Sequence, residues 1–306
     1  MIVAGPTGSG KSALALALAE AVAGIVINAD SMQVYREAAI LTARPTPADE
    51  ARVPHRLFGV LGADDPCSAG RWRALAIEEL AVADRAGRSA IVVGGTGLYL
   101  EVLLKGLAPV PPIPPSVRDG AARLFKTAGA ERFRSMLIER DPQAARLAVS
   151  DRQRLLRAWE VVEATGRTLT EWQRQGTSPP ARTFVVILLS PAREILYPAL
   201  DARFTRMLSA GGLDEARALH RRGLDPNLPL LKAVGIRQLL AHVGGALSLE
   251  AATAAARLAT RHYAKRQMTW FRHRLDAELC IREQFSERIG SEIFPDIRRR
   301  LLTGRI

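Results

Sequence analysis

Eight residues near the start of the chain fit the pattern G-x-x-x-x-G-K-[ST]: Gly5, Pro6, Thr7, Gly8, Ser9, Gly10, Lys11 and Ser12. They follow the apolar run MIVA and precede the helical pattern SALALALAEAV, which is the setting of a P-loop. In such a loop, backbone N–H groups and the positive end of the helix bind phosphate oxygens. The lysine adds charge and the serine hydroxyl can bind Mg²⁺. We therefore expect a phosphate site at residues 5–12.

Four uninterrupted apolar runs indicate the fold class. Each is short and rich in β-branched residues, as buried strands of a parallel sheet are, and helical patterns separate them. We expect an α/β fold with a P-loop-type parallel sheet and helices on both faces. Ligands of such sheets bind beyond the carboxyl ends of the strands. The runs are IVA at 2–4, GIVIN at 24–28, AIVVG at 90–94 and TFVVILLS at 183–190.

Two proline-rich breaks divide the chain of 306 residues. GLAPVPPIPPS at 106–116 holds five prolines, and QGTSPP at 175–180 is a second break of the same kind. Between them, residues 117–174 have helical periodicity and no strand-like run. We expect a discontinuous core of residues 1–108 and 181–306, with a helical insertion domain of residues 109–180 hinged on stiff linkers. The alternative is a few extra helices packed rigidly on the core.

The net charge of +12 is unevenly distributed. Lys and Arg number 9 against 10 Asp and Glu over residues 1–100, 13 against 9 over 101–180, and 21 against 12 over 181–306. A gradient of this kind is typical of a polyanion partner that contacts the later parts of the chain. The chain also has 38 Arg and only five Lys, so a genome that favours arginine explains the composition equally well.

Other features concern the compartment. No run of about 18 apolar residues occurs, so we expect no membrane span. The run MIVA leads directly into the glycine-rich loop, and we expect no signal or transit peptide. Cys67 and Cys280 lie far apart without CxxC spacing, which argues against a disulfide framework or a structural zinc site. A soluble, monomeric, cytoplasmic protein is the expectation.

After residue 190 the chain has a helical pattern almost to its end. The clearest helix is predicted at 250–274, where basic residues recur every four positions and almost no acid interrupts them. Such a stripe is most often a solvated helix face, but the lack of acids favours contact with a polyanion. The basic residues are Arg257, Arg261, Lys265, Arg266, Arg272, His273 and Arg274.

The usual partner acid of a P-loop is missing. ATP and GTP enzymes complete the magnesium site with an acid at the end of a later strand. Here the run at 90–94 continues into Gly95-Thr96-Gly97, and the run at 183–190 leads into Pro191. The nearest acid is Asp30, just after the second apolar run. It could cap a helix together with Gln33, or take part in catalysis, and the pattern alone leaves both open.

NADSMQVY at 28–35 is followed by VGGTGLYL at 93–100, and this combination is far more specific than a P-loop alone. With several longer segments, it resembles the tRNA dimethylallyltransferase family, whose members put an isopentenyl group on the exocyclic amine of the adenosine just 3′ of the anticodon. The segments are GPTGSGKS at 5–12, NADSMQVY at 28–35, TARPT at 42–46, PHRL at 54–57, VGGTGLYL at 93–100, SDRQRLLRAWEV at 150–161, KAVGIRQL at 232–239 and ATRHYAKRQMTWFR at 259–272.

The resemblance implies a mechanism and its residues. The loop at 5–12 would hold the diphosphate of dimethylallyl diphosphate as the leaving group, with Lys11 and Mg²⁺, held partly by Ser12, opposite the growing negative charge. Asp30 would accept the proton of the adenine N6 amine, and Thr96 would contact the substrate near the reacting groups, unless it is only a turn hydroxyl. The catalytic residues would thus be Asp30, Thr96 and Lys11.

An adenine stacked in an anticodon loop must be flipped out to reach such a site. For the arginine and apolar residues among those implied to face tRNA, surface solvation or helix packing is the alternative. The implied residues are Asp30, Ser31, Met32, Gln33, Thr96, Arg118, Gln153, Arg154, Leu155, Leu156, Arg157, Lys232, Ala233, Val234, Gly235, Ile236 and Arg237.

The chain departs from the family pattern at a few positions, and other functions compete with the one implied. A small-molecule P-loop kinase would explain the cradle but not the missing acid, and an adenylate isopentenyltransferase would use the same donor on a free nucleotide. A non-catalytic RNA-binding protein would leave Lys11, Ser12, Asp30 and Thr96 without purpose. The departures are Leu41 for glycine, Arg44 for lysine, Ser150 for asparagine, Ile236 for tyrosine and Cys67 for an aromatic residue.

Overall fold

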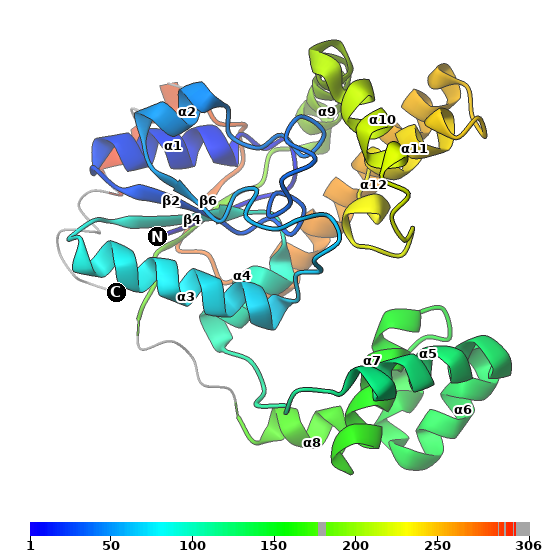
Figure 1. Cartoon of the computed structure of the whole chain (residues 1–306). Coiled ribbons are helices and arrows are strands. Elements are labelled where there is room, and N and C mark those ends of the chain that lie inside the picture. The colour runs from blue at the N-terminus through cyan, green and yellow to red at the C-terminus, as the bar shows by residue number, and fades with distance from the viewer. Residues whose placement is uncertain (177–181, 287, 291, 296, 298–306) are drawn as a thin grey trace. The chain divides into compact units, whose positions relative to one another are not determined.

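The structure, a computed structural model, describes residues 1–176, 182–286, 288–290, 292–295 and 297. The chain divides into two compact units, Met1–Leu104 with Ala181–Ile306, and Lys105–Pro180 (Figure 1). The first unit ends after residue 104, four residues before the boundary that we predicted after residue 108. Of the second proline break at 175–180, only Gln175 and Gly176 lie among the described residues.

The larger unit is built on a parallel sheet, as the apolar runs predicted. The order of the strands is β3-β2-β4-β1-β5-β6, and every pair is parallel. The four predicted runs correspond to β1, β2, β4 and β5. The bounds are Ile2–Ala4 (β1), Ile25–Asn28 (β2), His55–Arg56 (β3), Ala90–Gly94 (β4), Val186–Leu189 (β5) and Leu279–Ile281 (β6).

Alternation along the strands divides the core into two layers. Ile2 and Ala4 of β1 point into a cluster that includes Trp72 and Leu100, whereas Val3 points into a second cluster with Leu14. Helix α1 (Lys11–Ala21) therefore covers one face, and α3 (Ala69–Arg85) and α4 (Gly97–Lys105) cover the other (Figure 1). The expected helices on both faces are confirmed.

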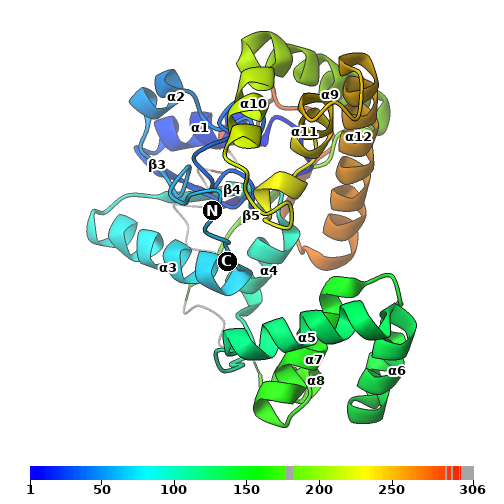
Figure 2. The same ribbon diagram turned by 45° about the vertical axis from the view of Figure 1, so that its right-hand side comes forward.

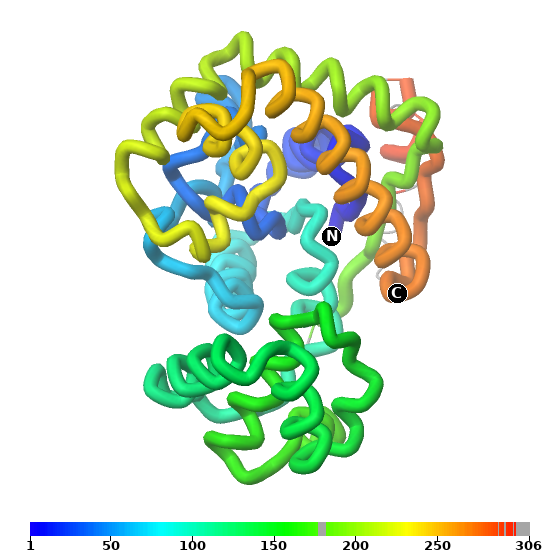
Figure 3. Tube along the Cα trace, turned by 90° about the vertical axis from the view of Figure 1, so that its right-hand side faces the viewer, coloured from blue at the N-terminus to red at the C-terminus, as the bar shows by residue number. Residues whose placement is uncertain are grey.

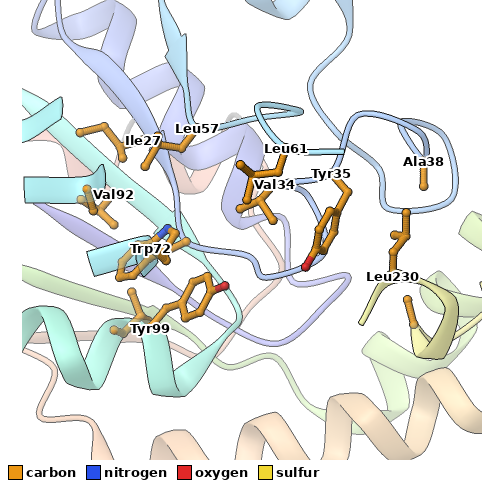
Figure 4. Packing of buried hydrophobic residues seen from close by; sticks show 14 of the residues in the cluster. Ile27, Val34, Tyr35, Ala38, Leu57, Leu61, Trp72, Val92, Tyr99 and Leu230 are labelled. Carbon is orange, nitrogen blue, oxygen red and sulfur yellow. The ribbon is translucent and has the colours of Figure 1, made fainter. Parts of the chain in front are cut away.

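A stacked aromatic pair fixes the end of β2. The rings of Trp72 and Tyr99 are nearly parallel, with centroids 4.4 Å apart (Figure 4). Trp72 is fully buried, and its Nε1 donates to the carbonyl oxygen of Asn28 at 2.8 Å. An aromatic pair of this kind contributes about 0.5–1.5 kcal/mol beyond its buried area. The pair thereby holds in place the residue two positions before Asp30.

The later part of the larger unit forms a cluster of helices (Figure 2). The carboxylate of Glu215, on α10, accepts from the amides of Ile40 at 2.8 Å and Leu41 at 2.9 Å, so this cluster is tied to the loop after β2. That loop leads to the short helix α2 (Pro47–Arg52), which Thr46 caps. The helices of the cluster are α9 (Arg193–Met207), η2 (Leu208–Gly212), α10 (Leu213–Arg221), η3 (Leu230–Lys232), α11 (Ile236–Val243) and α12 (Leu249–Arg274).

The expectation that the chain stays helical after residue 190 is wrong at β6. Leu279 pairs with Ile187 and Ile281 with Leu189, so β6 covers the edge that β5 would otherwise expose. Three residues at the edge of a sheet carry too little pattern to be recognised in the sequence. Helix α12, in contrast, agrees with the predicted helix at 250–274, beginning one position earlier at Leu249.

The smaller unit is helical, as the periodicity of residues 117–174 predicted. Phe133, Leu137 and Leu155 are fully buried in its core, and the ring of Trp159 lies 5.0 Å from that of Phe133. The helices of this unit are α5 (Pro115–Ala128), α6 (Ala130–Arg140), η1 (Pro142–Arg146), α7 (Arg152–Thr165) and α8 (Leu169–Arg174).

Nowhere in the described part of the chain is a helix long and apolar enough to span a bilayer.

Candidate functional site

The glycine-rich loop connects the central strand of the sheet to the first helix. β1 ends at Ala4 and α1 begins at Lys11. Gly8 and Gly10 have φ angles of 81° and 86°, which only glycine adopts without strain. Ser12 lies exposed in the first turn of α1, so its hydroxyl is accessible to a ligand at the helix N-terminus. The loop has the geometry of a phosphate cradle.

Three charged groups face one another beside this loop. Burial lowers the pKa of Lys11 to about 8, with Asp30 opposing the shift and Arg203 adding to it. Burial also lowers the pKa of Arg203, again opposed by Asp30. Nη2 of Arg203 donates to Oγ1 of Thr7 at 3.0 Å, which brings α9 to the cradle. Two cations and one carboxylate therefore share a partly desolvated site.

Asp30 does not cap a helix. Its Oδ1 accepts from the amide of Met32 at 2.9 Å, in a turn that no helix follows until α2. Gln33 is not its capping partner, because Nε2 of Gln33 donates to the carbonyls of Thr42 at 2.8 Å and Ala43 at 2.9 Å. Among the described residues, Oδ2 of Asp30 has no hydrogen-bond partner. One carboxylate oxygen of Asp30 is thus available to accept a proton.

Thr96 joins two loops at the carboxyl end of the sheet. Its Oγ1 accepts from the amide of Ser31 at 2.9 Å and lies 3.2 Å from the hydroxyl of Ser31. Its own amide donates to the carbonyl of Ala29 at 3.3 Å. Thr96 is therefore more than a turn hydroxyl, since it fixes the backbone next to Asp30.

A cavity of about 340 Å³ opens between these loops and the helix cluster. Its polar lining includes Thr7, Asp30, Arg203, Lys232, Tyr263 and Arg266. Apolar lining comes from Leu41, Leu200, Phe204, Met207 and Val234. The cavity thus combines charged groups with these apolar residues, which we call the apolar wall, and so suits a ligand with an anionic and a hydrocarbon part.

Three residues of this site had no individual signal in the sequence. Arg203 comes from α9, and Tyr263 and Gln267 come from α12, which passes the cradle (Figure 3). Burial raises the pKa of Tyr263 well above its ordinary value, and the charge of Asp30 adds to this. The segment ATRHYAKRQMTWFR contains two of them, but nothing in its periodicity distinguishes these positions from solvated ones.

The residues of the smaller unit implied to face tRNA divide into exposed and buried ones. Arg118, Gln153 and Arg154 are exposed. Arg157 is half-buried, and its Nη1 lies 3.7 Å from Oε2 of Glu160 in an ion pair. The side chain of Leu155 is 0% exposed and packs in the core of this unit, which favours helix packing for this residue. Leu156 is half-buried against that core.

The second implied run, at 232–237, likewise contains core residues. Lys232 is exposed and lines the cavity together with Ala233 and Val234, and Arg237 is exposed. Gly235 has a φ of 88° and directly precedes α11 as its N-cap residue. Ile236 is 0% exposed in the main core, which favours helix packing for this residue.

The basic stripe on α12 is partly neutralised by neighbouring helices. Arg261 forms an ion pair with Asp201 of α9, and Nη2 of Arg257 donates to Oγ1 of Thr205 at 2.8 Å. One acid that α12 itself lacks, Asp201, is thus supplied by another helix, and Thr205 of that helix accepts from a second arginine. His262, Lys265 and Arg266, with Thr269 and Trp270, instead line an open hollow on the surface of α12.

Two of the departures from the family pattern lie in the loop after β2, and one of them lines the cavity. Leu41 is 7% exposed and lines the apolar wall. The guanidinium of Arg44 donates to the carbonyls of Tyr35 and Arg36, each at 3.2 Å, and so braces the loop after β2. Both residues therefore have structural partners in this chain.

The donor atoms available for a metal are few. In the described ranges, no group of three or more His, Cys, Asp or Glu side chains is close enough to hold a metal ion. The hydroxyl of Ser12 is an oxygen donor of the kind that Mg²⁺ accepts, and Mg²⁺ typically takes its other ligands from substrate phosphates and water. The residues present fit a magnesium ion that binds together with a phosphorylated ligand.

The chain is similar to known proteins over most of its length. A family model described as IPP transferase matches residues 33–274, and one described as isopentenyl transferase matches residues 1–59. A tRNA dimethylallyltransferase of Rhodospirillum centenum is 54% identical over 280 residues, covering 90% of this chain and 89% of its own.

Solved structures extend the similarity to the fold. A tRNA isopentenylpyrophosphate transferase of Bacillus halodurans has a TM-score of 0.71 at 28% identity, with 99% of this chain and 96% of that chain covered. A eukaryotic dimethylallyltransferase shares the fold with a TM-score of 0.84 at 23% identity, with 100% of this chain and 79% of that chain covered. Likeness in sequence and likeness in fold thus extend over nearly the whole chain.

Proposed function

The chain belongs to the IPP transferase family, and from this premise we propose that it transfers a dimethylallyl group from dimethylallyl diphosphate to the N6 amine of the adenosine just 3′ of the anticodon. The family assignment itself makes the protein an enzyme that transfers a dimethylallyl group to tRNA. The prenyl donor, the acceptor atom and the residue roles are the proposal. One observation carries it: Thr7 of the phosphate cradle, the carboxylate of Asp30 and the apolar wall line the same cavity.

The leaving diphosphate has a complementary environment in the cradle. When the allylic carbon separates from the bridging oxygen, negative charge builds up on that oxygen. The loop amides other than those of Thr7 and Ser9, which donate within the protein, would stabilise it together with the ammonium of Lys11 and the guanidinium of Arg203. A Mg²⁺ ion held by Ser12 would add positive charge to the diphosphate when bound. Because no water needs activation, the absence of an acid after β4 fits this reaction.

The acceptor amine is a weak nucleophile, because its lone pair is delocalised into the adenine ring. Asp30 would accept its proton as the new C–N bond forms, and the available Oδ2 supports this role. Thr96 would keep the backbone next to Asp30 in register through its bond to Ser31. The hydrocarbon chain of the donor would lie against the apolar residues of the cavity, such as Leu200 and Phe204.

The adenosine must leave the anticodon stack to enter the cavity. Ser31, Met32 and Lys232 line the cavity and would contact the flipped nucleotide. Gln33 would support that edge by bracing the loop after β2. Exposed residues of both units, such as Arg118 and Arg237, would contact the rest of the RNA. A monomer in the cytoplasm, where tRNA is found, is consistent with this partner.

A transfer assay with labelled donor tests the proposal. With dimethylallyl diphosphate and Mg²⁺, the protein should prenylate an unmodified anticodon stem-loop and leave free AMP unmodified. Asp30→Ala should lower kcat by about 10²- to 10⁴-fold with donor binding largely retained, because the proton acceptor is lost while the phosphate cradle remains.

Asp214→Asn is the matched control, since this carboxylate is 77% exposed on α10 and should be dispensable. Prenylation of AMP instead of RNA, or transfer of the terminal phosphate of ATP to a metabolite, would contradict the proposed function. A parental rate for Asp30→Ala would contradict only the role of Asp30.

A further inference from the structure

Gln267 links two loops that are distant in the sequence. It is 6% exposed on α12. Its Oε1 accepts from the amide of Thr7 in the cradle at 2.8 Å, and its Nε2 donates to the carbonyl of Gly95 at 2.7 Å. One buried side-chain amide thus connects the loop after β1 to the loop after β4.

The orientation of this amide is determined by its partners. A flipped amide would place its oxygen against the Gly95 carbonyl and its NH₂ group against the Thr7 amide. The fit is also tight, because a Cβ atom at Gly95 would lie 2.4 Å from Nε2 of Gln267. A Cβ atom at Gly97 would lie 2.4 Å from the ring of Trp270, which follows one turn later on α12. This part of α12 is therefore fitted to the glycine-rich turn around Thr96.

The link continues to the acceptor side of the cavity. Thr96 follows Gly95, and its Oγ1 accepts from the amide of Ser31, the residue next to Asp30. On the other side, Thr7 accepts from Arg203 through its hydroxyl. Gln267 therefore lies between the groups assigned to the diphosphate and the groups assigned to the amine.

We propose that Gln267 is a positioning residue, which sets the separation between the diphosphate cradle and the proton-accepting side of the site. This inference rests on the proposed function. In a transfer between two bound substrates, the rate depends on the distance between the reacting atoms, and a misplacement of about 1 Å can cost about 10²-fold. Loss of the link should therefore lower kcat more than it weakens the binding of either substrate.

Gln284 provides a comparison within the same chain. Its Nε2 donates to the carbonyl of Gly8 at 2.8 Å, so it also holds the cradle through a side-chain amide. The hydrogen bond of Gln284 involves the cradle alone and does not reach the loop of Thr96. Loss of this amide should loosen the cradle, and with it donor binding, without changing the link to the acceptor side.

The experiment measures kcat and the KM for each substrate in the transfer assay. Gln267→Met keeps the volume and removes both hydrogen bonds, and kcat should fall about 10- to 100-fold while the KM for the donor changes less than about threefold. Gln267→Glu keeps an acceptor for the Thr7 amide but sets a carboxylate oxygen against the Gly95 carbonyl, and should lower kcat at least as much. Gln284→Met should raise the KM for the donor and retain most of kcat.

A core variant far from the site separates positioning from stability. Leu80 lies on α3 and is 5% exposed, so Leu80→Ala leaves a cavity in the core beneath this helix. This variant should retain kcat per folded molecule. Parental kcat for Gln267→Met, or a fall matched by Leu80→Ala at equal loss of melting temperature, would overturn the inference. The parent chain is assayed alongside, and its failure to prenylate the stem-loop would instead overturn the proposed function.

Discussion

Lys11 and Asp30 influence each other through the charges beside the cradle. Burial disfavours the ammonium form of Lys11, and the nearby carboxylate of Asp30 partly restores it. Without a bound anion, Lys11 therefore titrates near the upper end of the physiological range. The protonated form is the one that attracts the diphosphate.

This titration predicts a pH dependence of donor capture. The pKa of Lys11 is lowered to about 8, so its charge is present below pH 8 and is lost as the pH rises through that value. Because kcat/KM reports the free enzyme, kcat/KM for dimethylallyl diphosphate should fall above pH 8, by up to about tenfold per pH unit.

The control is Lys11→Arg, whose guanidinium keeps its charge in this range. Its activity should be lower throughout, but its profile should lack the fall above pH 8. A profile of the parent chain that stays flat from about pH 7 to 10 would contradict the assignment.

At the scale of elements, two glycines show how the same residue type serves different purposes. Gly94 ends β4, and a Cβ atom there would lie 2.1 Å from the carbonyl oxygen of Ala29. Gly120 lies within α5, and nothing is within 4 Å of a Cβ atom built there. The first glycine is required by a close approach of two backbones, and the second is not.

Alanine substitutions at these positions should therefore have opposite effects. Gly94→Ala forces β2 and β4 apart and should cost about 3 kcal/mol or more of stability. Gly120→Ala should stabilise α5 by about 0.5–1 kcal/mol, because alanine loses less backbone entropy in a helix. Thermal unfolding followed by calorimetry checks both, and an equal effect of the two substitutions would contradict the packing described.

The strands also show how far the sequence determines the fold. β1, β2, β4 and β5 are buried on both faces, and this burial produces the apolar runs that predicted them. β3 consists of His55 and Arg56, and β6 of three residues at the opposite edge. Such strands form only because a neighbouring strand offers free hydrogen-bonding groups, so no local sequence pattern predicts them.

The candidate site likewise contains residues that the sequence predicts and residues that only the folded structure reveals. The cradle, Asp30 and Thr96 lie in contiguous motifs, each next to a strand, and could be found from the sequence. Arg203 and Gln267 reach the site from helices that follow the smaller unit in the chain, and only the folded sheet brings them to Thr7. Their roles depend on tertiary contacts that no spacing encodes.

At the scale of the whole molecule, the charge of +12 is only partly available to a ligand. Arg261 and Arg257 are engaged by α9, and Arg274 lies 3.6 Å from Glu101. Exposed cations such as Lys265 remain on the surface of α12. A polyanion that binds many such cations releases the counterions around its phosphates.

RNA binding should accordingly depend steeply on salt. The KM for the stem-loop should rise more than about tenfold between about 50 and 200 mM salt, whereas the KM for the donor should change much less. Lys265→Gln should reduce the slope of log KM against log salt by about one if this lysine contacts a phosphate. Equal salt dependence for both substrates would argue against an extended RNA contact.

The interruption of the sheet by the smaller unit has a consequence for biosynthesis. β1 lies between β4 and β5, but β5 is translated only after residues 105–180. One side of β1 therefore lacks its neighbour while the intervening helices emerge from the ribosome. An open strand edge invites pairing with another nascent chain. The length of the smaller unit therefore sets how long that edge stays unpaired during synthesis.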